Sequence, residues 1–192
     1  MPQYQLSLLL MLLLVGCASA TTHYYVLDAH NRHIQAKPGT AIIALKLSIP
    51  RYLDRAQLVS RTEPHQLLIA ENHQWAGQLH ENIARVLSDD LSGLLRYRVL
   101  PMPLYADLHA DGTLLVDIHR FERMADGHLR LDAVWHMFRH GKRIHSGSVS
   151  LASKQTFDSR DYAEIANTMS RLLDHMAADI AQKLEHLPDS AR

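Results

Sequence analysis

Apolar and polar residues alternate along three stretches in the second half of the chain: 114–121, 129–138 and 144–151. A period of two is typical of half-buried β-strands, because successive side chains point to opposite faces of a sheet. Asp126-Gly127 lies between the first two stretches and 140–142 between the last two, and such sequences favour tight turns. The pattern therefore predicts an antiparallel meander with one face in water.

Shorter strand patterns precede the meander, at 24–27, 41–49, 57–60, 66–69 and 97–100. The longest of them alternates apolar and polar residues and ends at Pro50, whose ring cannot continue a hydrogen-bonded ladder. Glu63-Pro64 separates the third pattern from the fourth and favours a turn, so these two are expected to form a hairpin. We expect 72–77 to lead into the helix that follows.

Two stretches repeat apolar residues at the helical period of 3.6. The first should end near Leu95, and its apolar stripe is Leu79, Ile83, Val86, Leu87, Leu91 and Leu94. Its polar residues, expected to face away, are Glu81, Arg85, Asp89 and Asp90. The second follows a capping sequence at 158–161, and its stripe is Ile165, Met169, Leu172, Leu173, Met176, Ile180 and Leu184. Two such helices can cover one face of a mixed or antiparallel sheet, which predicts a two-layer α+β domain.

The N-terminus has another pattern, a strongly apolar run at Leu6–Val15, interrupted only by Ser7, that is followed by Gly16 and Cys17. The run is about ten residues, too short to span a bilayer but long enough for a secretory signal. It resembles a bacterial lipoprotein signal. The resemblance implies cleavage before Cys17, a diacylglyceryl group on its sulfur and a further acyl chain such as palmitate on its new amino group. Ala18, where Asp would imply inner-membrane retention, points to the outer membrane; the alternative is an ordinary secretory signal cleaved after Ala18 or Ala20.

These patterns divide the chain into four parts. They are a signal peptide (1–16), the lipidated Cys17 with a short tether (17–23), one periplasmic domain (24–187) and a loose tail (188–192). Removal of the signal leaves about 175 residues, enough for one domain with its own core. The chain carries 20 Lys and Arg against 20 Asp and Glu, so overall charge favours no nucleic-acid partner. Cys17 is the only cysteine, which leaves no thiol for a disulfide, a metal or a nucleophile once it is lipidated.

Catalytic and metal-binding patterns find little support. Four of the 14 histidines fall on or near the meander, and three imidazoles can hold zinc, but we expect a solvated polar face instead; they are His119, His136, His140 and His145. Asp117 and Glu122 should lie on opposite sides of one strand and so form no acid/base pair. No nucleophile elbow and no glycine-rich phosphate loop occurs. The sequence therefore predicts a binding protein without a cofactor, not an enzyme.

The candidate partner-binding residues are Arg51, Tyr52, Asp54, Arg55 and Trp75. The first four form a compact turn after Pro50, and Arg and Tyr are enriched at the anchors of protein interfaces. One interpretation is a loop for partner binding or self-assembly. The other is an intramolecular turn in which Asp54 pairs with an arginine and Tyr52 lies on the core. For Trp75 the alternatives are a lipid contact and packing on the sheet.

Several short motifs follow one another in a characteristic order: Tyr24-Tyr25, Leu27-Asp28, 49–55, 58–61, 72–76, 87–91, 120–122, and Leu131 with Trp135. With them the chain resembles the ABC-type transport auxiliary lipoprotein family, the PqiC and YmbA group. The resemblance runs from the lipid site to the last helix.

This resemblance implies an outer-membrane lipoprotein that accompanies a lipid transporter. Its partner would be a periplasmic tunnel of mammalian-cell-entry (MCE) domains, which the lipoprotein would dock at the outer membrane, supporting envelope integrity. A stack of tunnel rings makes a homo-oligomer, even a ring, the expected assembly. Two alternatives stay open: a carrier that shields an acyl chain between helices and sheet, and an activator of a cell-wall synthase.

Overall fold

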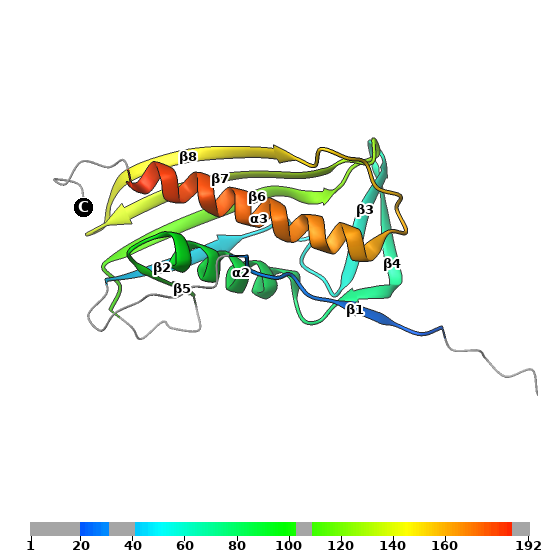
Figure 1. Ribbon diagram of the computed structural model, residues 1–192, viewed down its shortest axis with the longest axis horizontal. Helices are drawn as coiled ribbons and strands as arrows, with labels where there is room; N and C mark the ends of the chain where they lie inside the picture. Colours follow the sequence, from blue (N-terminus) through cyan, green and yellow to red (C-terminus); the bar gives the residue numbers. More distant parts are fainter. Residues whose placement is uncertain (1–19, 31–40, 103–108, 186–192) are drawn as a thin grey trace, which may run out of the picture.

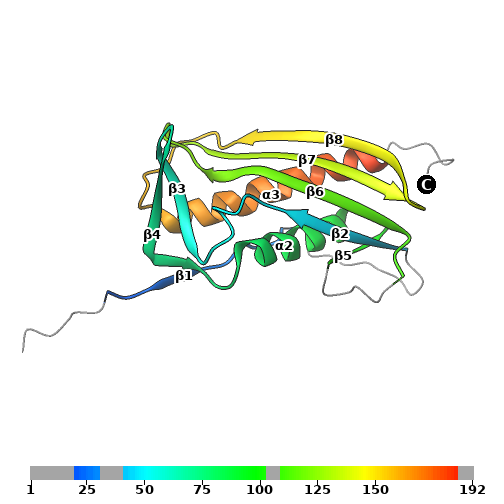
Figure 2. The ribbon, with the colours of Figure 1, turned by 180° about the vertical axis from the view of Figure 1, so that it is seen from behind.

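The computed structural model describes residues 20–30, 41–102 and 109–185. In this part of the chain, eight strands form one sheet and two helices cover one of its faces (Figure 1). Seen from behind, neither of these two helices covers the other face of the sheet, which is the open face (Figure 2). This arrangement confirms the expected two-layer α+β class. Neither described helix combines the length and the apolar composition needed to cross a bilayer.

The strands are β1 (His23–Tyr25), β2 (Ile42–Ser48), β3 (Gln57–Glu63), β4 (Gln66–Trp75), β5 (Arg98–Pro101), β6 (Gly112–Arg123), β7 (Leu129–Arg139) and β8 (Lys142–Ala152). The helices are α2 (Leu79–Leu94) and α3 (Tyr162–Glu185). The sheet is mixed: β3–β4 and β6–β7–β8 pair antiparallel, whereas β1–β4, β2–β5, β2–β6 and β3–β6 pair parallel.

The meander of β6, β7 and β8 is confirmed with its turns. Gly127 has a φ of +85° in the first turn. In the second turn, His140 (φ +50°) and Gly141 (φ +74°) connect the paired residues Arg139 and Lys142. Positive φ at both central residues is what a two-residue hairpin loop requires, because that geometry matches the twist of the strands.

The strand β4 is longer than the alternation in 66–69 predicts. It continues to Trp75, through the segment expected to lead into α2. The reason is a distant partner: β1 pairs parallel with its last three residues, His23 with His73 and Tyr25 with Trp75. A local pattern cannot show a pairing between segments about 50 residues apart in the chain.

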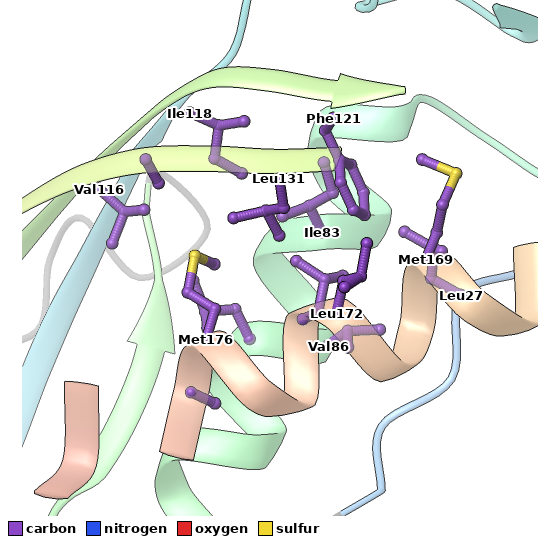
Figure 3. Packing of buried hydrophobic residues seen from close by; sticks show 14 of the residues in the cluster. Leu27, Ile83, Val86, Val116, Ile118, Phe121, Leu131, Met169, Leu172 and Met176 are labelled. Atoms are coloured by element: carbon purple, nitrogen blue, oxygen red, sulfur yellow. The ribbon is translucent and has the colours of Figure 1, made fainter. Parts of the chain in front are cut away.

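The apolar stripes of both helices face the sheet and form one core with it. Ile83 and Val86 of α2, Leu172 of α3 and Phe121 of β6 lie together there (Figure 3). Their side chains are almost completely withdrawn from water. Burial of this apolar surface is the main force that joins the two layers.

The segment after β1 crosses both helices, and it explains one wrong prediction. Asp90 was expected to face water but is fully buried. Its Oδ1 accepts the backbone N–H of His30 at 2.8 Å, and the N–H of Asp28 donates to Ser170 Oγ on α3 at 3.1 Å. Leu27, which precedes Asp28, is fully buried among the core residues (Figure 3). The segment therefore ties the chain's start to both helices.

Candidate docking surface

The predicted turn, residues 51–55, lies beside the part of β6 at which its paired strand changes from β2 to β3. β6 pairs with β2 along 112–117 and meets β3 only at Arg123, opposite Ser60. The connection from β2 to β3 occupies the interval between these two pairings. Its backbone is compact, because Leu53 donates to the carbonyl of Pro50 at 2.9 Å. Leu53 is 2% exposed and anchors the turn in the core.

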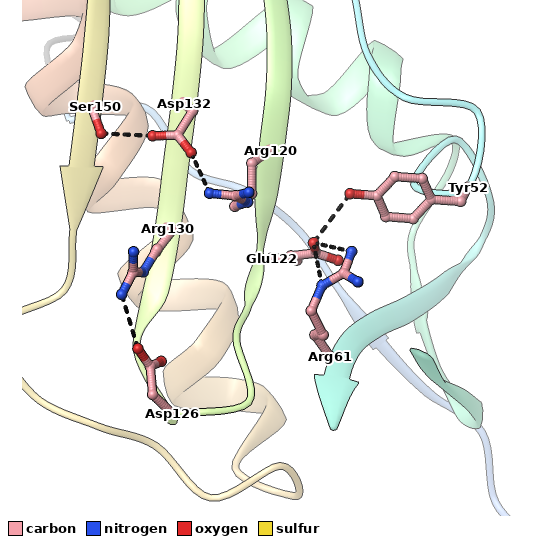
Figure 4. Close-up of polar contacts among 8 residues, drawn as sticks. All are labelled: Tyr52, Arg61, Arg120, Glu122, Asp126, Arg130, Asp132 and Ser150. Atoms are coloured by element: carbon pink, nitrogen blue, oxygen red, sulfur yellow. Dashed lines mark hydrogen bonds and ion pairs between the residues drawn. The ribbon is translucent and has the colours of Figure 1, made fainter. Parts of the chain in front are cut away.

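A buried carboxylate supports the turn from the open face of the sheet. Tyr52 donates its hydroxyl to Glu122 Oε1 at 3.1 Å, and Arg61 of β3 donates to the same atom through Nε at 3.2 Å and Nη2 at 2.9 Å (Figure 4). The side chain of Glu122 is completely buried and that of Arg61 is 21% exposed. Glu122 thus joins the turn, β3 and β6.

The electrostatics of this group keep Tyr52 and Arg61 in their hydrogen-bond-donating forms. Burial raises the pKa of Tyr52, and the nearby charge of Glu122 raises it further, so the hydroxyl remains a donor. The hydrogen bond to Glu122 is the main cause that raises the pKa of Arg61, so the guanidinium stays charged. A charged donor is the partner that a buried carboxylate needs, because an unpaired buried charge is strongly unfavourable.

Glu122 reaches the open face because of a β-bulge, and this corrects one expectation. The register between β6 and β7 shifts between Ile118 and Arg120, so one extra residue reverses the alternation beyond it. Asp117 and Glu122 therefore lie on the same face, not on opposite faces. They still form no acid/base pair, because Asp117 bonds to His119 at 3.2 Å while Glu122 bonds to Arg61 and Tyr52.

The four predicted turn residues divide into two groups. Arg51 and Asp54 are exposed, whereas Tyr52 and Arg55 are half-buried. Tyr52 lies against the core, as one of the two interpretations holds, but no ion pair joins Asp54 to an arginine among the described residues. The turn therefore exposes Arg51 and Asp54 to water.

Trp75 is not a surface residue. Its side chain is 3% exposed, so Trp75 packs in the core, which agrees with the second of its two alternatives, packing on the sheet. It lies with Leu53, Phe121 and Met169 around a small cavity behind the turn. Its backbone N–H donates to the carbonyl of Ala56 at 2.6 Å. Trp75 thus supports the turn from beneath.

The core leaves little room for a ligand. The cavity beside Trp75 measures about 10 Å³, whereas ligand pockets measure roughly 300–1,000 Å³. An open hollow of about 670 Å³ lies between α2 and β5. Val99 and Leu100 of β5 line it together with charged residues of α2 such as Arg85 and Asp89. Among the described residues, the core behind the turn is therefore filled, whereas the hollow beside α2 is open to water and lined in part by charged side chains.

The meander histidines do not gather into a metal site. His119 and His136 lie on the open face, and His145 lies against the ring of Trp135 at 5.4 Å between centroids. In the described part of the chain, no three His, Cys, Asp or Glu side chains lie close enough to hold a metal ion. Cys17, the predicted lipidation site, and the tail 188–192 lie outside the described residues.

The described residues thus form one α+β domain with a packed core and an exposed, firmly supported turn. Residues 25–181 match the family model of the ABC-type transport auxiliary lipoprotein component, and the chain belongs to this family.

Relatives of this chain include the intermembrane transport lipoprotein PqiC of Escherichia coli K12 and that of Shigella flexneri. Each is 28% identical over 181 residues, which cover 91% of this chain and 94% of the relative.

Solved structures share the fold. The crystal structure of an uncharacterized protein has a TM-score of 0.70 at 25% identity and covers 86% of this chain and 99% of its own. A Xanthomonas campestris protein has a TM-score of 0.61 at 18% identity and covers 83% of this chain and 93% of its own.

Proposed function

We propose that this protein is an outer-membrane lipoprotein that docks the periplasmic MCE tunnel of an intermembrane lipid transporter. The observation that carries the proposal is the family match over residues 25–181, supported by the similarity to PqiC, whose name describes intermembrane transport. The protein acts by binding, not by catalysis. Its contribution is to hold one end of the transport system at the membrane and so to support envelope integrity.

Docking, not carriage of lipid, agrees with the filled core. An acyl chain would need an enclosed pocket of several hundred Å³. The cavity among the core residues measures about 10 Å³, and the hollow of about 670 Å³ between α2 and β5 is open to water and lined in part by charged side chains. The exposed turn is better suited to a protein partner. Its backbone is fixed by Leu53, Tyr52 and the Glu122 group, so the partner meets a surface that is already ordered, which lowers the entropy cost of binding.

The membrane attachment that we propose is the lipidated Cys17. The residues between Cys17 and His23 reach about 20 Å at most when extended, so β1 would lie near the membrane. Replacement of Cys17 by Ser should move the protein from the outer-membrane fraction to the soluble periplasm. If the variant still fractionates with the outer membrane, the lipid anchor is wrong.

Charge exchange in the turn tests the docking role. The double variant Arg51→Glu with Asp54→Lys keeps the net charge, and it should lower co-purification of the MCE tunnel protein about tenfold or more. The matched control is Lys154→Glu with Glu164→Lys, an exchange of two exposed residues far from the turn along the chain. Equal recovery with both double variants would exclude the turn as the contact. Co-purification of a cell-wall synthase in place of the tunnel protein would overturn the proposed function.

Native mass spectrometry of the detergent-extracted protein tests the remaining parts together. We expect the mass of the acyl chains on the processed chain and a homo-oligomer, with a closed ring as the assembly that suits a tunnel of stacked rings. A monomer with an unmodified N-terminal thiol would contradict both expectations.

A further inference from the structure

Basic side chains gather at one end of the sheet because of its register. Arg98 of β5 pairs with Ile42 of β2, the next residue of β2 pairs with Gly112 of β6, and Gly112 pairs with Arg139 of β7. Arg139 in turn pairs with Lys142 of β8. Neighbouring strands lie about 4.8 Å apart, so these basic residues form a row across the sheet end. With the adjacent residues in sequence, the basic end comprises Arg96, Arg98, Arg139, Lys142 and Arg143.

Most of these charges face water without a counterion. Arg96, Arg98, Lys142 and Arg143 are exposed, and none of the four forms an ion pair with the residues that the structure describes. Arg139 is half-buried, with its guanidinium 5.9 Å from the ring centre of Tyr97.

Two acidic residues lie near this end in the part of the chain that the structure describes, Asp111 and Glu185. Asp111 precedes β6, and its Oδ2 accepts the backbone N–H of Ile42 at 2.8 Å. Glu185 ends α3, where Lys183 pairs with Asp179 at 2.7 Å. His140, in the turn between β7 and β8, adds positive charge when it is protonated.

Outside the basic end, the chain has more acidic than basic side chains. Because the whole chain has 20 basic and 20 acidic residues, five cations at one end leave an acidic excess elsewhere. The start of α3 is one such place, with Asp158, Asp161 and Glu164 all exposed. The start of α3 lies at the end of the molecule opposite the turn between β7 and β8 (Figures 1 and 2).

We propose that the basic end is a second docking surface, which binds an acidic segment of a protein partner. The inference rests on the proposed function, because it presupposes a lipoprotein that is held at its N-terminus and binds a protein partner. It adds that the partner carries acidic residues and contacts the basic end. β1, which continues the N-terminal tether, lies at the opposite end of the long axis (Figures 1 and 2). The basic end therefore points away from the membrane that the tether reaches, which favours a protein over lipid headgroups. Arginine also binds carboxylates through two parallel hydrogen bonds, and exposed arginines are enriched at protein interfaces.

A labelled poly-glutamate peptide tests this surface with the full chain in a nonionic detergent. Fluorescence anisotropy should show binding that weakens as salt increases, since exposed charges are screened. The variant Arg98→Glu with Lys142→Glu should bind about tenfold more weakly or worse. The matched control, Lys154→Glu with Arg160→Glu, makes the same charge change at exposed sites outside the basic end and should bind as the unchanged protein does.

Each other outcome has a definite meaning. Equal weakening by both double variants would show an effect of net charge alone and overturn the proposal, as would no weakening by either. Vesicles containing phosphatidylglycerol provide the lipid arm. If they bind through Arg98 and Lys142 while the peptide does not, the surface recognises headgroups and the proposal is overturned.

Co-purification and peptide binding together distinguish a failure of this inference from a failure of the proposed function. If the MCE tunnel protein co-purifies equally well with Arg98→Glu and Lys142→Glu in place, the basic end is not a tunnel contact and the docking role stands. If the tunnel protein never co-purifies but the peptide binds only through the basic end, the docking role is wrong and the acidic-partner surface stands.

Discussion

Phe121 and Glu122 are consecutive residues of β6, both almost completely buried, yet they lie on opposite faces of the sheet. Phe121 is covered by the two helices and by other apolar side chains (Figure 3). Glu122 is covered by Tyr52 and Arg61, which donate hydrogen bonds to it (Figure 4). One face is therefore stabilised by the area of apolar surface removed from water, and the other by a few directed polar contacts.

This difference determines how substitutions on each face affect stability. An apolar core has many interchangeable contacts, so its loss of stability follows the volume removed. A buried polar group depends on two or three partners, so loss of one member leaves the others without a hydrogen bond. On the open face, that dependence also connects stability to the shape of the candidate docking turn.

The largest effect should come from the covered face. Phe121→Ala is expected to lower the free energy of unfolding by about 3–5 kcal/mol, because it leaves a cavity in a tightly packed core. Denaturant unfolding followed by circular dichroism measures it. Leu115→Ala, at a half-buried position of the same strand on the open face, is the matched control and should cost about 1 kcal/mol. Equal losses would mean that the two faces do not differ as described.

Glu122→Ala should have the next largest effect, about 2–3 kcal/mol, because it removes the acceptor of both Tyr52 and Arg61. Hydrogen exchange at the amides of Leu53 and Arg55 should become faster, since the turn loses its support. Asp117→Ala, an exposed acid on the same strand and face, should change stability by less than about 0.5 kcal/mol. Unchanged exchange in the turn would show that Glu122 does not hold it.

A smaller effect on stability is expected from a change of pH, through His73 at the edge of the face that the helices cover. His73 stacks on Tyr162 of α3 at 3.8 Å between ring centres, and burial, then the neighbouring His23, lowers its pKa. A histidine with a lowered pKa binds its proton more readily in the unfolded chain. Stability should therefore be full above about pH 6.5 and fall as the pH decreases through that value. Thermal unfolding between neutral and mildly acidic pH measures this, and His73→Phe, which keeps an aromatic ring, should show a smaller fall; an identical fall would exclude His73 as the cause.

The smallest effect should come from an ion pair on the open face. Arg120 donates to Asp132 at 2.7 Å, and Ser150 donates to the other oxygen of the same carboxylate at 2.7 Å (Figure 4). Both charged side chains reach water, 40% and 27% exposed. A double-mutant cycle with Arg120→Ala and Asp132→Ala should give a coupling of about 0.5 kcal/mol. A coupling above about 2 kcal/mol would place this pair with Glu122, not with ordinary surface charges.

In the candidate site, the sequence predicts the local turn but not the distant residues that support it. The turn was predicted correctly as a compact element after Pro50, because its residue types are local signals. Its support by Glu122 was missed. One signal was present: Ile118 and Phe121 are both buried but three positions apart, and this break in the alternation marks a bulge. For Trp75 the sequence left a lipid contact and packing on the sheet open, because no local pattern shows that β1 pairs with its strand and closes the core over it.

The sequence by itself determined the two layers of this protein, the meander with its turns and the apolar stripes of both helices. These features depend on side-chain periodicity and on turn residues, which act over a few positions. Only the tertiary structure decided that β6 meets β2 and then β3, that Asp90 and Glu122 are buried, and that five cations share one end of the sheet. The physical reason is that these features arise from pairings between segments far apart in the chain, whose register is set by the packed core as a whole.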